Sequence, residues 1–112
     1  MPNTWITDLR HYLDETVNFP PDLPPEAFNL ASHLGKIVEA ITARKQIGIA
    51  IATGISCRRR PEHKKCSGKI AGLLDQKDGN RIKWSCPACG ENGVISGWQE
   101  TMWDKAHNPA FL

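Results

Sequence analysis

The sequence predicts an α+β fold in which N-terminal helices pack on a small antiparallel sheet. Three observations support this prediction: apolar residues recur at helical spacing between Glu26 and Lys45, β-branched residues alternate with small ones from Ile47, and four cysteines follow. With 112 residues, the chain is long enough for one domain with a modest core. We therefore expect a single domain over residues 1–112, with a helical part at 1–45 and a sheet-forming part at 46–112.

A first helix is predicted over residues 4–15, because its apolar side chains lie at the spacing of one helix face. These side chains are Trp5, Ile6, Leu9, Tyr12 and Leu13. The prolines of residues 19–25 each fix their own φ angle and push the preceding residue toward an extended conformation. We interpret residues 19–25 as a stiff connector within the helical part.

A longer helix is predicted from Glu26 to Lys45. Pro25 suits its first turn, where a missing N–H costs nothing, and Glu26 complements the positive end of the helix dipole. Gly35 costs this helix about 1 kcal/mol relative to alanine, which we interpret as a position where another backbone comes close. The apolar face comprises Ala27, Leu30, Ala31, Leu34, Ile37, Val38 and Ile41.

The sheet is predicted to begin with a buried strand from Ile47 to Ile55, where β-branched residues alternate with glycine and alanine. We expect the small-residue face of this strand to lie against the helix. A hairpin turn is predicted at Asp78-Gly79, between a second and a third strand, and Ile82 and Trp84 should share one face of the third. The further strands are predicted at 69–74, 81–85 and 94–98, and the tail at 99–112 has no clear periodicity.

Four cysteines predict a metal site: Cys57, Cys66, Cys86 and Cys89. Cys86 and Cys89 enclose Pro87 and precede Gly90, which is the pattern of the tight turn called a zinc knuckle. Glycine supplies the positive φ angle that turns backbone N–H groups toward the sulfurs. A redox pair or disulfides would use the same residue types, so both remain alternatives. Metal binding is favoured because the two pairs make a complete set of four ligands.

We expect this metal to be one structural Zn²⁺ per chain. Catalytic zinc usually has three protein ligands and a water molecule, whereas four cysteines fill all four positions. Iron is the main alternative, because thiolate-rich tetrahedral sites accept it. Zinc is favoured because rubredoxin-like iron sites normally use two C-x-x-C turns, and this chain has one.

The cysteine arrangement resembles a zinc ribbon, in which the metal clamps one end of a small antiparallel sheet. The sheet predicted at 46–112 is therefore zinc-ribbon-like. Zinc ribbons usually have two residues between the first two cysteines, whereas eight separate Cys57 from Cys66. More narrowly, the chain is similar to a family of small uncharacterised bacterial proteins, a resemblance that implies no activity. The motifs are Cys-Arg-Arg-Arg-Pro at 57–61, Cys-x-Gly at 66–68, Trp-Ser-Cys-Pro-Ala-Cys-Gly at 84–90, Gly-Val-Ile-Ser-Gly-Trp at 93–98 and Trp-Asp at 103–104.

The charge balance gives little indication of a strongly basic surface. The formal net charge is +2, and Zn²⁺ bound by four thiolates contributes 2 − 4 = −2, so the loaded protein should be close to neutral. The sequence starts without a basic segment followed by an apolar run. No stretch approaches the roughly 18 apolar residues of a membrane span. We expect a cytoplasmic protein that does not contact membranes.

Two functions fit these features. The first is a protein-interaction or assembly module with a protein partner, because the helices and a thin sheet offer more apolar surface than the sheet can cover. The alternative is a nucleic-acid-binding zinc ribbon that uses the basic loop 58–65. The same cations would also stabilise a negatively charged metal–thiolate centre. The candidate contact residues are Arg58, Arg59, Arg60, Lys64 and Lys65.

An enzyme is not expected. The sequence shows no nucleophile–base pair, no phosphate-binding loop and no carboxylate pair, and no small-molecule substrate is evident.

Overall fold

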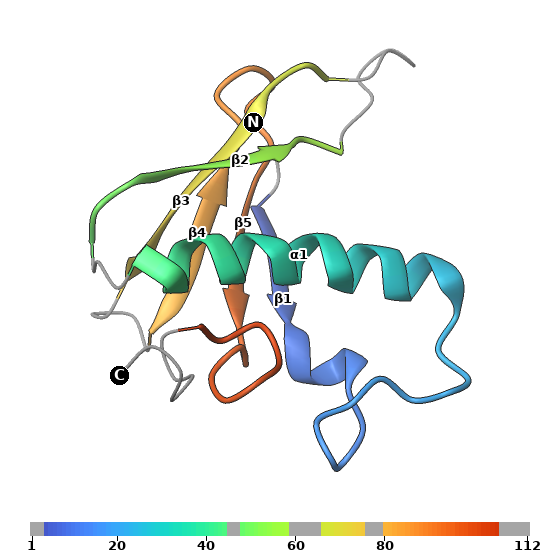
Figure 1. The fold of residues 1–112 in the computed structure, drawn as a ribbon. Helices are drawn as coiled ribbons and strands as arrows, with labels where there is room; N and C mark the ends of the chain where they lie inside the picture. The colour runs from blue at the N-terminus through green and yellow to red at the C-terminus, as the bar shows by residue number, and fades with distance from the viewer. Residues whose placement is uncertain (1–3, 45–47, 59–65, 76–79, 106–112) are drawn as a thin grey trace.

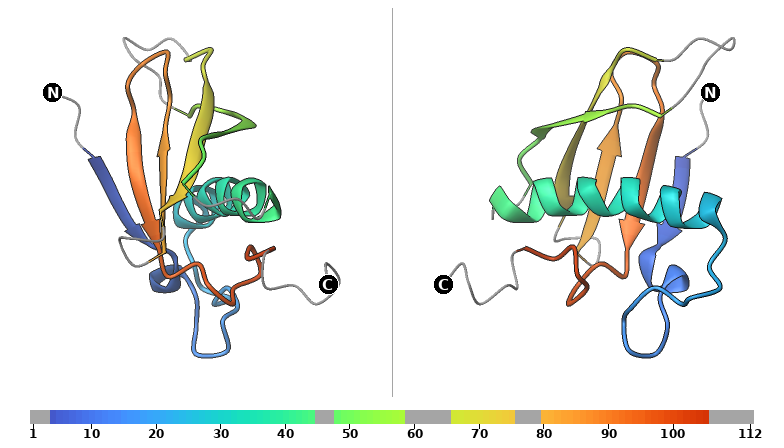
Figure 2. Two further views of the ribbon diagram at one scale, coloured as in Figure 1. Left: turned by 90° about the vertical axis from the view of Figure 1, so that its left-hand side faces the viewer. Right: turned by 45° about the vertical axis from the view of Figure 1, so that its right-hand side comes forward.

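A five-stranded sheet with one long helix across one of its faces forms the core of the computed structural model (Figures 1 and 2). The structure describes residues 4–44, 48–58, 66–75 and 80–105. The sheet order is β1-β5-β4-β3-β2, and the α+β fold class is therefore confirmed. The elements are β1 (Thr4–Asp8), the 3₁₀ helix η1 (Leu9–Tyr12), α1 (Pro25–Arg44), β2 (Ile51–Ser56), β3 (Lys69–Asp75), β4 (Arg81–Ser85) and β5 (Asn92–Ser96).

The long helix predicted from Glu26 is confirmed as α1, which starts one residue earlier, at Pro25. Its buried face includes Leu34, Ile37, Val38 and Ile41, each at most 3% exposed. These residues belong to one apolar cluster with Ile51, Ile70, Ile82, Trp84 and Ile95 of the sheet. Burial of this shared surface is the main stabilising term available to so short a chain. Among the described residues, no helix has both the length and the apolar character that a membrane span requires.

The centre of the sheet follows the predicted alternation. β4 pairs antiparallel with β3 and with β5. Ile82 and Trp84 are buried, and the residues between and beside them are exposed. The predicted hairpin turn at 76–79 lies outside the described residues, although Asp75 pairs with Arg81 on either side of it. The last strand is Asn92–Ser96 instead of 94–98.

The helix predicted over residues 4–15 is wrong. Thr4–Asp8 forms β1, which pairs parallel with β5, so the sheet is mixed and not purely antiparallel. The β-branched and aromatic residues of this stretch favour a strand once a partner edge is present. That partner lies far along the sequence, and the local helical spacing of Trp5 and Leu9 gives no sign of it. Leu9 is fully buried, whereas Trp5 is 57% exposed.

The predicted Ile47–Ile55 strand is partly wrong. β2 begins at Ile51, and Ile49 before it is 54% exposed. The branched face is the inward one, since Ile51 is only 6% exposed while Ala52 is exposed, so the small-residue face does not cover the helix. Larger apolar side chains gain more from burial, and that gain decides which face turns inward.

The chain after β5 returns to α1 through a tryptophan. Trp103 is 5% exposed, and its indole lies on Gly35, where any side chain would overlap the ring. The close approach predicted at Gly35 is therefore made by a side chain and not by a backbone. Phe19 completes the contact from the proline-rich connector, with its ring centroid 5.6 Å from that of Trp103.

Gly35→Ala should therefore destabilise the protein, although alanine is the better helix former by about 1 kcal/mol. The added methyl group would displace the indole of Trp103, and overpacking of this kind costs about 1–3 kcal/mol. Chemical denaturation gives the free energy of unfolding of Gly35→Ala, of Trp103→Leu and of the double variant, and the three values together measure the coupling between the two residues. A Gly35→Ala variant that is more stable than the wild type would contradict this packing.

Candidate metal centre

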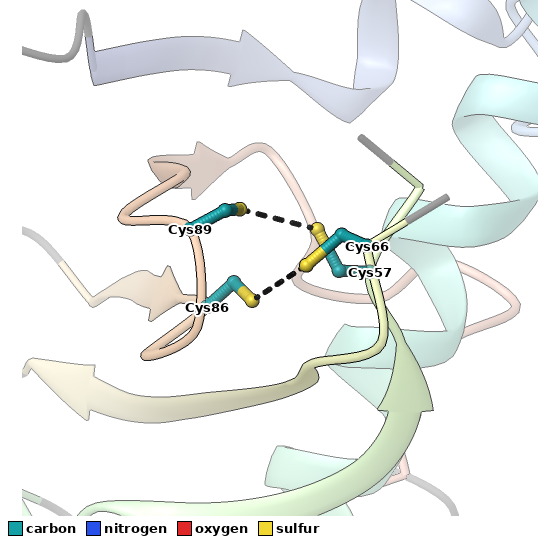
Figure 3. Close-up of side chains that lie close together, drawn as sticks. All are labelled: Cys57, Cys66, Cys86 and Cys89. Carbon is teal, nitrogen blue, oxygen red and sulfur yellow. Dashed lines mark hydrogen bonds between the residues drawn. The ribbon is translucent and has the colours of Figure 1, made fainter. Parts of the chain in front are cut away.

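The four cysteines meet at one end of the sheet, where two pairs of strands begin or end. Cys57 directly follows β2, and Cys66 lies three residues before β3. Cys86 directly follows β4, and Cys89 lies three residues before β5. Figure 3 shows the two halves facing each other, so that all four sulfurs point into one small space. The cluster thus links the β2–β3 half of the sheet to the β4–β5 half.

The distances between the sulfurs fit a tetrahedral metal ion. All four Sγ atoms lie within 4.8 Å of one another. The Sγ–Sγ distance is 3.7 Å between Cys57 and Cys89 and also 3.7 Å between Cys66 and Cys86. A tetrahedron with metal–sulfur bonds of about 2.3 Å has edges of about 3.8 Å. The four cysteines are therefore placed to hold a metal ion.

The turn from Cys86 to Gly90 has the geometry expected of a knuckle. The Gly90 N–H donates to the Cys86 carbonyl at 2.8 Å, and the Cys86 N–H donates to the Glu91 carbonyl at 2.7 Å. Gly90 has a φ angle of +81°, as its place after the second cysteine predicts. These hydrogen bonds join residues that are close in sequence, which explains why this half of the site could be predicted from the sequence.

The other half is held differently, because Cys57 arrives from a strand and not from a second knuckle. The Cys57 N–H donates to the carbonyl of Gly68 at 3.0 Å, and the Gly68 N–H donates to the sulfur of Cys66 at 3.3 Å. Gly68 thus connects the two cysteines that eight residues separate. Most of the intervening loop, residues 59–65, lies outside the described residues.

Burial and hydrogen bonds act in opposite directions on the ionisation of the cysteine sulfurs. Cys57, Cys66 and Cys86 are at most 8% exposed, and Cys89 is partly exposed. Burial acts to raise the pKa of the Cys86 thiol, but hydrogen bonds from the N–H groups of Cys89 and Ala88 and with the thiols of Cys66 and Cys89 together lower that pKa to about 7. Burial raises the pKa of Cys89. A site that already favours one thiolate loses fewer protons when a metal binds.

Gly68 is a site residue whose role the sequence prediction missed. A Cβ atom at this position would overlap the sulfur of Cys86 and lie 2.7 Å from the Cβ of Ala88. The backbone at Gly68 therefore has to approach the opposite knuckle closely, and only glycine allows this. The Cys-x-Gly spacing at 66–68 was the available signal, but it does not reveal which side chain the glycine would meet.

Of the cations proposed to contact a partner, the structure describes only Arg58. It is exposed directly after Cys57, and its charge acts on His33 of α1. The pKa of His33 is lowered to about 4, first by burial and then by the positive charges of Arg58 and Lys36. The charge of Arg58, directly after Cys57, therefore acts on the helix. Arg59, Arg60, Lys64 and Lys65 lie outside the described residues.

Gly68→Ala should weaken metal binding by about 10–100-fold, the usual effect of disturbing the groups that support metal ligands. The added methyl group must move the sulfur of Cys86 and the Cβ atom of Ala88. Competition with a chromophoric chelator measures the affinity. Ser67→Ala is the matched control, because Ser67 is the exposed neighbour, and it should bind metal as the wild type does. Equal affinity of the two variants would contradict the close approach.

Arg58→Gln should raise the pKa of His33 toward its ordinary value of about 6.5, because one of the two positive charges is removed. Arg44→Gln, at the far end of the same helix, should leave that pKa unchanged. NMR titration of the imidazole ring compares the two variants. The pKa of His33 is lower in the folded protein than in the unfolded chain, so His33 contributes to the free energy of unfolding above about pH 6.5. This contribution is on the order of 1 kcal/mol after solvent screening, and it is lost as the pH falls toward 4. A His33 pKa in Arg58→Gln equal to that of the wild type would contradict the influence of Arg58 on α1.

Comparisons with protein-family models, with curated proteins and with solved structures found no match. The clustered cysteines are consistent with the zinc-ribbon resemblance, but no family relationship supports it.

Proposed function

We propose that this chain is a small protein whose fold depends on one structural zinc ion and which acts as a protein-interaction or assembly module. The observation that carries the proposal is the sulfur cluster, in which four thiols from two halves of the sheet lie at tetrahedral spacing. Zinc is favoured over iron because only one half of the site is a C-x-x-C turn. Zinc also has no redox chemistry, which suits an ion with a purely structural role.

The proposed structural role of the ion is supported by the number of ligands available to it. Four cysteine sulfurs complete a tetrahedron, and a closed site leaves no position for water or substrate. When bound, the ion would supply binding free energy that becomes folding free energy, because the ligands come together only in the fold. Cys57, Cys66, Cys86 and Cys89 would hold it, and the module is therefore proposed to be non-catalytic.

The interaction role is supported by the face of the sheet opposite α1. Ala71, Leu73 and Val94 lie on this face by their strand registers, opposite the buried positions. They line a groove of about 370 Å³ together with Thr4 and Lys83. Figure 2 shows the sheet edge-on with α1 on one side and this face open among the described segments. An antiparallel sheet can expose one face to water, but apolar side chains on it favour a partner surface.

The alternative function, nucleic-acid binding through the loop 58–65, is supported by Arg58, which is exposed beside the metal site. Lys69, Arg81 and Lys83 add positive charge to the open face of the sheet. Against this alternative, Lys83 forms an ion pair with Asp75 at 2.8 Å, which reduces the net charge there. An affinity for DNA or RNA that falls steeply with salt would favour the alternative.

Metal analysis and thermal unfolding test the structural role. The purified protein should contain one zinc ion per chain, and a chelator should lower its melting temperature or unfold it, because metal binding and folding are coupled. Cys89→Ser should lose zinc, whereas Ser85→Ala, an exposed position one residue before Cys86, should keep it. A folded protein that binds no metal, or whose melting temperature is unchanged by the chelator, would contradict the proposal.

A further inference from the structure

The two edges of the sheet differ in how well they are protected against pairing with another strand. The β2 edge is irregular: its register with β3 shifts between Ala52 and Ser56, and Gly54 has a φ angle of +75°. The Thr53 hydroxyl donates to the carbonyl of Ile70 at 2.7 Å and fixes this bulge. Bulges are one of the devices by which proteins prevent edge-to-edge association.

The β1 edge, Thr4–Asp8, has no such device. All five residues pair in continuous parallel register with β5. The strand contains no proline, no lysine and no glycine. Among the described residues, no further strand pairs with its outer side, and Figure 2 shows β1 as the outermost strand. Half of the backbone groups of an edge strand point outward and can pair with another chain.

Two large apolar side chains of this edge are exposed. Ile6 is 81% exposed and Trp5 is 57% exposed. The indole N–H of Trp5 donates to the Glu91 carboxylate, and the Thr4 hydroxyl donates to Asn92 at 2.7 Å. These bonds hold the strand and the tryptophan ring in place before any partner arrives. An ordered apolar surface loses less conformational entropy on binding than a mobile one.

We infer that β1 pairs antiparallel with β1 of a second copy of this chain, joining two five-stranded sheets into one continuous sheet. This inference rests on the proposed interaction role and adds to the open face of the sheet a second surface, the β1 edge, together with its partner. The pairing is centred on Ile6, which then lies opposite Ile6 of the second copy. The outward N–H and C=O groups of the two strands satisfy each other, as in other cases of β-strand addition.

The sequence of the strand is complementary to itself in this register. Trp5 lies opposite Thr7, an aromatic–β-branched pair of the kind that stabilises sheets. Asp8, the strand's only charged residue, lies opposite Thr4, and the two Asp8 carboxylates stay at opposite ends. A register that brought them face to face would be destabilised by like charge. This charge placement favours a second copy in the centred register.

The net charge of the protein also permits self-association. The formal charge is +2, and a Zn²⁺–tetrathiolate centre brings the total close to zero, so repulsion between copies is weak. The contact is small, because one five-residue strand per copy buries less than the roughly 1,200 Å² of a standard interface. We therefore expect a dimer that dissociates on dilution.

Sedimentation velocity of the full-length protein, at concentrations differing by about a hundredfold, tests the pairing. The wild type should be a dimer at the high concentration and a monomer at the low one. Ile6→Lys should weaken association by at least about tenfold, because two lysines would face each other in the pair. Ile49→Lys is the matched control: Ile49 is 54% exposed beside the other edge of the sheet, and its replacement should leave the dimer intact.

Amide hydrogen exchange of the wild type provides a second measurement that needs no variant. Amides of β1 should exchange more slowly at the high concentration, while those of the bulged β2 edge should not change. A wild type that is monomeric at both concentrations overturns the inference, and so does an Ile49→Lys variant that dissociates as readily as Ile6→Lys. A folded monomer containing one zinc overturns the pairing alone. A dimer without zinc supports the pairing and overturns the proposed role of zinc.

Discussion

The meeting of two sheet halves at the cysteine cluster is the constraint on which the rest of the structure depends. β2 and β3 contain glycines that weaken them as isolated strands. Their ends carry Cys57 and Cys66, and the sulfurs of these residues lie 3.7 Å from those of Cys89 and Cys86. A link of this kind fixes the ends of four strands at once. It also sets the sheet surface against which α1 packs.

A second constraint acts along one flank of the buried helix face, through side chains that are distant in sequence. Trp103 lies on Gly35, and the Thr42 hydroxyl accepts a hydrogen bond from the Lys105 N–H at 3.0 Å. Phe19 adds the connector before α1 to the same cluster. The buried face of the helix is thus covered partly by the sheet and partly by the segment that follows β5.

How much of this could be predicted depended on whether the decisive interaction was local. α1, the alternation of Ile82 and Trp84, and the turn ending at Gly90 are each determined by residues close in sequence, and all three were predicted. β1 was not predicted, because the same apolar residues fit helical spacing and its partner strand begins 88 residues later, at Asn92. Gly68 was missed as a site residue for a similar reason, since the atom it must avoid belongs to Cys86.

The position of β1 has a consequence for the order of folding. Its only paired neighbour among the described strands is β5, so β1 cannot join the sheet until nearly the whole chain is available. Contacts between distant segments form late, because closing a long loop costs entropy before the contact contributes. During synthesis the segment containing Trp5 and Ile6 therefore remains unpaired, with these apolar side chains exposed, while the helix and the central strands assemble. β1 is also the strand that can detach with the least disturbance to the core. The last strand to join the sheet during folding is therefore also the first to separate from it by local unfolding.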